Sequence, residues 1–379
     1  MKNNNYEFNK THTQLAKGIA IILMMTHHLF KFPDKIKDVS YISIMPFWNQ
    51  SIFSEKSFEF FLGDFAKICI AMYLFLSGYG LYMAYSKKGT FTFGDSVEKV
   101  IKFFIAYWKI FIIFIPIGLI WFSESAAFHF NIIEFMANFF ALSSSYNVAW
   151  WFARLYIELL LLFPLVIWLL KRGFIFSIVL TLSLYIISFK MDSVFMIVPQ
   201  LSFLKKTFFY PDMVNILFWQ IVFCVGCLTA KYNVFVSINK FISRKNLDTK
   251  VFYISMILVI MLIRIGSTFV FESIGQGNAT YIDFILAPLF ILSCTNLINR
   301  NRSKNIVLAL GKNSTNMWLT HTFFCYYYFQ ELVFLPKISI LILIWLAVLS
   351  LSTSLVINFV TKLSYTMYDI VSRKGVSLK

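Results

Sequence analysis

The sequence has few charged residues. Only 14% of its 379 residues are charged, whereas soluble domains have roughly 25%. In their place 59% of the residues are hydrophobic, and the mean hydropathy is +0.72. This composition excludes an ordinary water-soluble globular protein, so we expect lipid to surround most of the chain.

Cysteine is also scarce. The chain has 5 cysteines, all within apolar runs, and an odd number in such positions argues against a disulfide framework. Cys224 and Cys227 form a CxxC pair, but no second pair or neighbouring histidine completes a zinc site. We therefore predict neither a metal nor a redox centre.

What the sequence does have is long apolar runs. A helix needs about 20 residues to cross about 30 Å of hydrocarbon. Ten segments meet this requirement with few charges: about 14–32, 66–86, 98–122, 147–170, 174–190, 212–230, 250–270, 279–297, 314–333 and 337–361. The sequence therefore predicts an all-α, polytopic membrane helix bundle of about ten transmembrane helices. We expect a single domain over 1–379 with a membrane core at about 14–361 and no fused soluble domain.

Basic residues outnumber acidic ones, 34 to 18, which gives a net charge of +16. Most of the cations fall on the side of the predicted bundle that holds the N-terminus, and a smaller set, in which we count Arg264, falls in the loops on the opposite side. The positive-inside rule thus predicts a protein of the cell (cytoplasmic) membrane with both termini in the cytoplasm. Because the cations follow one membrane face, they indicate contact with a lipid bilayer and give no support for nucleic acid as a partner.

Ionisable residues inside an apolar span are costly, so each is a functional candidate. The segment "LAKGIAIILMMTHHLF" holds Lys17, His27 and His28. At about 100° per residue, Lys17 and His28 share one face and lie about 16 Å apart along the helix, whereas His27 lies about 100° away. A neutral imidazole can accept a proton from a hydroxyl near neutral pH. We predict that His28 is catalytic and that His27 is structural.

Two further spans carry polar residues. Ser77, in "YLFLSGYGLY", can form a hydrogen bond between helices, but no nucleophile elbow surrounds it and a serine acyl-enzyme is not expected. Trp151, Arg154 and Glu158 share one face of the fourth span. Arg154 and Glu158 have the spacing of a helical ion pair, and the sequence leaves open whether this pair is structural or contacts a substrate.

The ninth span begins with "LGKNSTNMWLTHTFF". We predict that Ser314 caps this helix and that the helix N-terminus, together with Lys312, forms a cationic site. His321 lies seven residues further on the same face. A role in a pocket and a structural hydrogen bond both remain open for His321.

In order and spacing these motifs resemble those of the acyltransferase-3 family. Members of this family are integral membrane enzymes that modify cell-surface glycans, usually by O-acetylation. The similar segments are "KGIAIILMMTHH", "LFLSGYGL", "WWFARLYIELLLLFP", "FCVGCLTAKYNVF" and "LGKNSTNMWLTHTFF", spread over residues 15–325. Lys17 stands where many members have arginine, and Tyr156 stands where many have glutamate, with Glu158 two residues later.

The resemblance implies an O-acetyltransferase with cytoplasmic acetyl-CoA as donor. The acceptor would be a surface or precursor glycan (capsule, exopolysaccharide or O-antigen) approached from outside. His28 would act as general base or as transient acyl carrier. The cations expected to bind the phosphates of CoA are Lys17, Lys99, Lys102 and Lys312. Arg154, Ser77 or a backbone donor would hold the oxyanion, and Trp151, Glu158, Ser314 and His321 complete the candidate substrate site.

A function from another class is a transporter or flippase of a glycan or small anion, in which buried histidine and Arg–Glu pairs gate the pathway. Interrupted helices at matching positions of two halves would favour it, and the sequence shows no such pairing. Release of the CoA thiol would distinguish the two functions. The sequence leaves open whether the protein forms a homo-oligomer.

Overall fold

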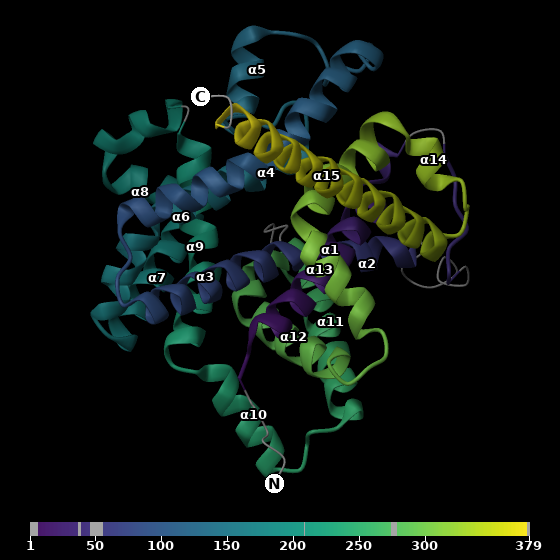
Figure 1. Ribbon diagram of the computed structural model, residues 1–379. Helices are drawn as coiled ribbons and strands as arrows, with labels where there is room; N and C mark the ends of the chain where they lie inside the picture. The colour runs from purple at the N-terminus through teal and green to yellow at the C-terminus, as the bar shows by residue number, and fades with distance from the viewer. Residues whose placement is uncertain (1–6, 37–38, 46–55, 208, 274–278, 377–379) are drawn as a thin grey trace.

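The computed structural model describes the whole chain except residues 1–6, 37–38, 46–55, 208, 274–278 and 377–379. The described part is helical, and its only β pairing is an isolated bridge between Ile42 and Ile338. The α-helices of Figure 1 are α1 (Lys10–Phe30), α2 (Phe58–Ala66), α3 (Cys69–Lys88), α4 (Phe93–Trp121), α5 (Ile132–Phe139), α6 (Trp151–Lys171), α7 (Phe174–Phe189), α8 (Met191–Ile197), α9 (Tyr210–Lys231), α10 (Val234–Arg244), α11 (Lys250–Ser273), α12 (Asp283–Ile298), α13 (Lys304–Thr322), α14 (Gln330–Phe334) and α15 (Ser339–Val376). Short 3₁₀ segments are η1 (Pro33–Lys35), η3 (Val148–Trp150), η4 (Pro199–Lys206) and η5 (Ala279–Ile282), and η6 (Phe323–Tyr328) is a π-helix.

Each of the ten predicted spans overlaps at least one helix, so the all-α prediction is confirmed for the described residues. Within these residues, 7 helical segments are long and apolar enough to cross a membrane. The helix α7 has only 16 residues, and the polar side chains of α1 and α13 keep these two helices out of that set. The chain is a multi-pass membrane protein, whereas the predicted number of ten spans is not confirmed.

Two predictions about individual polar residues are wrong. The helix α13 begins at Lys304, ten residues before the expected start, so Ser314 lies inside it and caps no helix end. Its hydroxyl donates to the Gly311 carbonyl at 3.0 Å. The apolar residues of "NIVLAL" (305–310) have helical periodicity, so the helix extends towards the N-terminus of the predicted span, through a stretch expected to be a polar loop. The cationic helix N-terminus expected beside Lys312 therefore does not exist.

Contrary to the prediction, Arg264 does not lie in a loop. It lies in α11 with 0% of its surface exposed, and its guanidinium forms two parallel bonds to Asp283 of α12, 2.8 Å from Nε to Oδ1 and 3.1 Å from Nη2 to Oδ2. This geometry is the strong bidentate form of the arginine–carboxylate pair. Asp64 of α2 joins the cluster, because its carboxylate accepts from Thr268 at 2.8 Å and forms an ion pair with Lys31. The cluster ties α11 and α12 to the end of α1.

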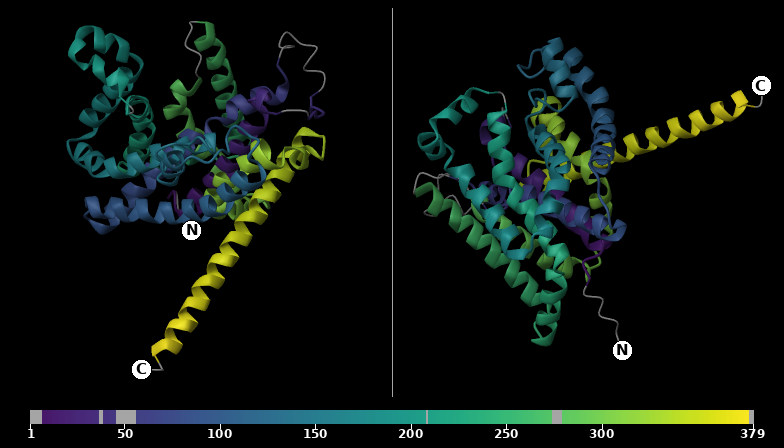
Figure 2. Two further views of the ribbon diagram at one scale, coloured as in Figure 1. Left: turned by 90° about the horizontal axis from the view of Figure 1, so that it is seen from above. Right: turned by 90° about the vertical axis from the view of Figure 1, so that its left-hand side faces the viewer.

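Glycines set the helix crossings on which the site depends. The helices α1 and α13 lie side by side near the middle of the bundle, while α15 extends away from it (Figures 1 and 2). A Cβ atom at Gly311 would lie 1.9 Å from the Gln14 carbonyl oxygen, so the backbones of α1 and α13 approach as closely as glycine alone allows. A Cβ atom at Gly18 of α1 would likewise clash with the Val307 carbonyl of α13. Gly78 and Gly226 allow an equally close approach of α3 and α9.

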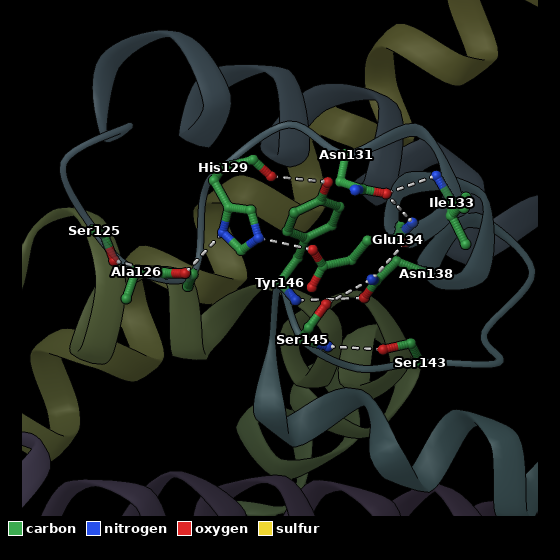
Figure 3. A network of polar contacts seen from close by, with 11 residues as sticks. Ser125, Ala126, His129, Asn131, Ile133, Glu134, Asn138, Ser143, Ser145 and Tyr146 are labelled. Carbon is green, nitrogen blue, oxygen red and sulfur yellow. Dashed lines mark hydrogen bonds and ion pairs between the residues drawn. The ribbon is translucent and has the colours of Figure 1, made fainter. Parts of the chain in front are cut away.

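The connection between α4 and α6 folds into a polar network around α5 (Figure 3). Asn131 caps α5 by accepting from the Ile133 and Glu134 amides at 2.9 and 3.1 Å. The Glu134 carboxylate lies 3.0 Å from His129 Nε2, and the Asn138 side chain donates to Ser145 at 2.8 Å. These bonds fix the chain just before α6, whose first turn contributes to the site described below.

Candidate functional site

Two histidines from distant parts of the sequence meet where α1 and α13 end. His28 Nδ1 lies 2.6 Å from His321 Nε2, and the two rings stack with centroids 4.9 Å apart. His321 is completely buried, whereas His28 is partly exposed. The π-helix that follows α13 brings Tyr326 back to α1, where its hydroxyl donates to the His28 carbonyl at 2.7 Å. Such π turns are frequent at functional sites.

The backbone determines which ring nitrogens carry protons. His321 Nδ1 lies 3.1 Å from the Met317 carbonyl and 2.8 Å from the Trp318 carbonyl, and because carbonyls only accept, Nδ1 must be the protonated nitrogen. The Nε2 atom of neutral His321 then accepts the Nδ1 proton of His28. Neutral His28 is therefore left with an unprotonated Nε2, which is the atom a general base needs.

His28 lines a cavity of about 270 Å³, called here the His28 cavity. Its wall includes Lys35 and Lys67, the indole of Trp151 and the ring of Tyr326. No carboxylate is among the described residues that line it, so its fixed charges are positive. A reacting oxygen that becomes negative in this cavity would be stabilised by the two lysines.

His27 occupies a different environment from His28. It is 5% exposed, and its Nδ1 donates to the Gly63 carbonyl at 2.8 Å. Its ring also borders the His28 cavity. This bond to the main chain ties α1 to α2, which is the structural role that the sequence predicts for His27.

Two more cavities lie along α1, and each shares lining residues with the next. The Ser77 cavity, of about 100 Å³, shares Phe152 and Trp318 with the His28 cavity, and the rings of these residues meet edge to face with centroids 5.4 Å apart. The Lys99 cavity, of about 450 Å³, shares Lys17 and Tyr156 with the Ser77 cavity. The three cavities thus follow α1 for on the order of 20 Å.

The predicted cations divide between these cavities and the surface. Lys17 lines both the Ser77 cavity and the Lys99 cavity, and Lys99 and Lys102 line the latter. Lys102 also pairs with Glu98 on the exposed side of α4. Lys312 lies on an exposed face of α13 and does not line these three cavities.

The polar residues expected to hold substrate are similarly divided. Ser77 and Ser314 line the Ser77 cavity, where Ser77 donates to the Tyr73 carbonyl at 2.7 Å. Arg154 lies outside all three cavities and pairs with Glu158 at 3.2 Å and with Asp212 at 2.6 Å. The structure thus places the predicted oxyanion candidates Ser77 and Arg154 away from the His28 cavity.

Sequence reasoning assigned no role to Lys35 or Lys67, the cations that line the His28 cavity. The signal for Lys67 was present, since it is a charged residue at the start of a predicted span, between what are now α2 and α3. Lys35 lies in η1 and carries no such signal. Among the described residues no cluster of three or more His, Cys, Asp or Glu side chains could hold a metal ion.

The described residues form a bundle with several helices able to span a membrane, and the His28 imidazole lines an internal cavity of this bundle. The family described as an acyltransferase domain matches residues 14–365, so the chain belongs to the acyltransferase-3 family and is an acyltransferase. This match confirms the resemblance seen in the sequence motifs. No curated protein and no solved structure shows a significant match to the chain.

Proposed function

We propose that the protein transfers an acetyl group from cytoplasmic acetyl-CoA to a hydroxyl of a cell-surface or precursor polysaccharide. The observation that carries the proposal is the series of cavities along α1, which begins among lysines and ends at the His28 imidazole. Along this series a donor and an acceptor would reach one proton-accepting atom from opposite membrane faces.

The donor would enter at the Lys99 cavity, on the side of the bundle where the positive-inside rule places the cytoplasm. Lys17, Lys99 and Lys102 surround this cavity and would pair with the phosphates of CoA. The smaller Ser77 cavity would hold the thin pantetheine arm, which would carry the thioester past the rings of Phe152 and Trp318 towards His28.

In the transfer step the acceptor hydroxyl oxygen attacks the thioester carbonyl carbon while His28 Nε2 takes the hydroxyl proton. The carbonyl oxygen becomes negative, and Lys67 and Lys35 are the cations that line this cavity. The carbon–sulfur bond then breaks, and the CoA thiolate leaves and receives the proton from the His28 imidazolium. In a two-step variant the same Nε2 atom would first carry the acetyl group itself.

The test uses the purified protein in nanodiscs with acetyl-CoA and de-O-acetylated surface polysaccharide from the source cells. Native protein should release the CoA thiol and acetylate the glycan. His28→Ala should lower both rates by about 10²–10⁴, the usual contribution of a general base. His27→Ala is the matched control and should retain most activity, because its Nδ1 is bonded to the Gly63 carbonyl.

Equal losses in the two variants would contradict the role assigned to His28. Glycan movement across the membrane without release of thiol would instead support the transporter alternative and refute the acetyltransferase.

A further inference from the structure

A fourth cavity, of about 430 Å³, adjoins the His28 cavity. It is called here the Trp219 cavity and lies among α6, α7, α9 and η5. Lys67 and Trp151 line both cavities, so the two share a boundary. No step of the transfer described above uses this space, although its volume is within the range of about 300–1,000 Å³ for ligand pockets.

One wall of the Trp219 cavity is a group of aromatic rings. Phe189 and Tyr281 meet with centroids 4.7 Å apart, and Phe218 and Trp219 with centroids 4.9 Å apart. Trp151 extends the group, with its ring 6.5 Å from that of Trp219. The rings support one another, so the wall is preformed.

Apart from Val214, the other lining residues are polar. Asn215 of α9 and Ser188 of α7 border the cavity, as does Thr280 of η5. Thr280 is 3% exposed, and its hydroxyl has no hydrogen-bond partner among the described residues. Leaving a buried hydroxyl unpaired costs about 1–3 kcal/mol. The Thr280 oxygen itself does not reach the cavity surface, so a ligand in the cavity would remove this cost through a side-chain rotation that turns the hydroxyl towards it.

We propose that the Trp219 cavity is an acceptor subsite that binds a pyranose ring of the glycan next to the residue that is acetylated. A sugar ring has an apolar C–H face, which packs on aromatic rings, and an edge of hydroxyls, which bond to groups such as those of Thr280 and Asn215. A lipid tail fills the aromatic part equally well but leaves the Thr280 hydroxyl unpaired.

This proposal rests on the proposed function and adds the means of acceptor recognition. Since Lys67 and Trp151 border both cavities, a glycan held in the Trp219 cavity extends past them into the His28 cavity. The subsite therefore selects the glycan, while His28 acts on the neighbouring sugar. Its loss should weaken acceptor binding without affecting the donor.

The kinetic test compares Thr280→Val and Asn215→Leu with native protein in nanodiscs, using de-O-acetylated oligosaccharides of the surface polysaccharide as acceptor. Each variant should raise the acceptor KM about tenfold, the effect of one lost hydrogen bond to a buried group, and leave the acetyl-CoA KM and kcat near native values. Thr353→Val is the matched control, because its hydroxyl on α15 bonds to the Leu349 carbonyl at 2.9 Å, away from the cavity. An unchanged acceptor KM in both variants, or an equal rise in the acetyl-CoA KM, would overturn the proposal.

A binding measurement separates this proposal from the proposed function. The native cysteines are all buried, so a maleimide should label an Asn215→Cys variant chiefly at the new thiol. The oligosaccharides should slow labelling, and decane, a probe for lipid tails that has no hydroxyl, should not. Equal protection by decane would assign the cavity to lipid and overturn the subsite. Protection by sugar in a protein that never releases CoA would uphold the subsite and refute the acetyltransferase.

Discussion

His28 and His321 share a hydrogen bond of 2.6 Å between Nδ1 and Nε2, although 293 positions separate them in the chain. Two backbone carbonyls hold the His321 ring, and the His321 ring in turn holds that of His28. The arrangement resembles in its logic a carboxylate that orients a catalytic histidine, except that the orienting group is neutral. His321 is thus a positioning residue, which acts on the substrate through His28.

This role predicts different effects for two substitutions of His321. His321→Leu removes the acceptor for the His28 Nδ1 proton, so the tautomer is no longer fixed, and kcat should fall about 10²-fold with little change in KM for either substrate. His321→Gln keeps an acceptor oxygen and should recover part of the loss. Steady-state kinetics on both variants measure this, with intact folding checked by size-exclusion chromatography. Equal kcat values for the two variants would show that His321 only fills space.

The sequence predicted the part of the site that lies on one helix. Lys17 and His28 share a face of α1 because their spacing of eleven residues is close to a whole number of helical turns. Because this relationship involves residues of a single helix, it can be predicted without knowledge of the tertiary structure. The choice of His28 over His27 came from the same rotation, and the structure accordingly places His28 beside His321 and His27 against the main chain.

The rest of the site depends on contacts between distant segments, which periodicity does not contain. Lys67 lies in the break between α2 and α3, and Trp151 is the first residue of α6. Both line the His28 cavity, which the local sequence around them does not indicate. The Ser314 prediction was wrong because a capping motif was read at a polar stretch that the helix passes through. Arg264 was misplaced because its partner, Asp283, lies on another helix.

The donor cations should differ in importance according to the cavity that they line. Lys99→Gln and Lys17→Gln should each raise the acetyl-CoA KM by about tenfold, since each removes a charge beside the expected phosphate site. Lys312→Gln is the control, because Lys312 is exposed and does not line these cavities. The measurement is the acetyl-CoA KM at several salt concentrations. A rise for Lys312→Gln equal to that for Lys99→Gln would refute the assignment of the Lys99 cavity to the donor.

The buried pair of Arg264 and Asp283 should be important for stability. Arg264→Met leaves the Asp283 carboxylate buried without its counter-charge, which costs about 3–5 kcal/mol. The double variant Arg264→Met/Asp283→Leu removes both charges and should recover most of that loss. Thermal unfolding in detergent, followed by fluorescence of labelled native cysteines, compares the three proteins. A double variant less stable than Arg264→Met would show that the pair does more than neutralise charge.

The crossing of α1 and α13 should be the most sensitive part of the fold to small substitutions. A Cβ atom at Gly18 would lie 2.1 Å from the Val307 carbonyl oxygen, so Gly18→Ala must push the two helices apart. His28 and His321 lie on these same two helices, and the separation should therefore break their hydrogen bond as well as lower stability by about 1–3 kcal/mol. Gly266→Ala is the matched control, because no atom lies within 4 Å of the position that its Cβ would take and Gly266 lines none of the cavities described above. Transfer rates and melting temperatures should fall together for Gly18→Ala and stay native for Gly266→Ala. If Gly18→Ala kept native kcat while its melting temperature fell, the two histidines would hold their geometry independently of this crossing.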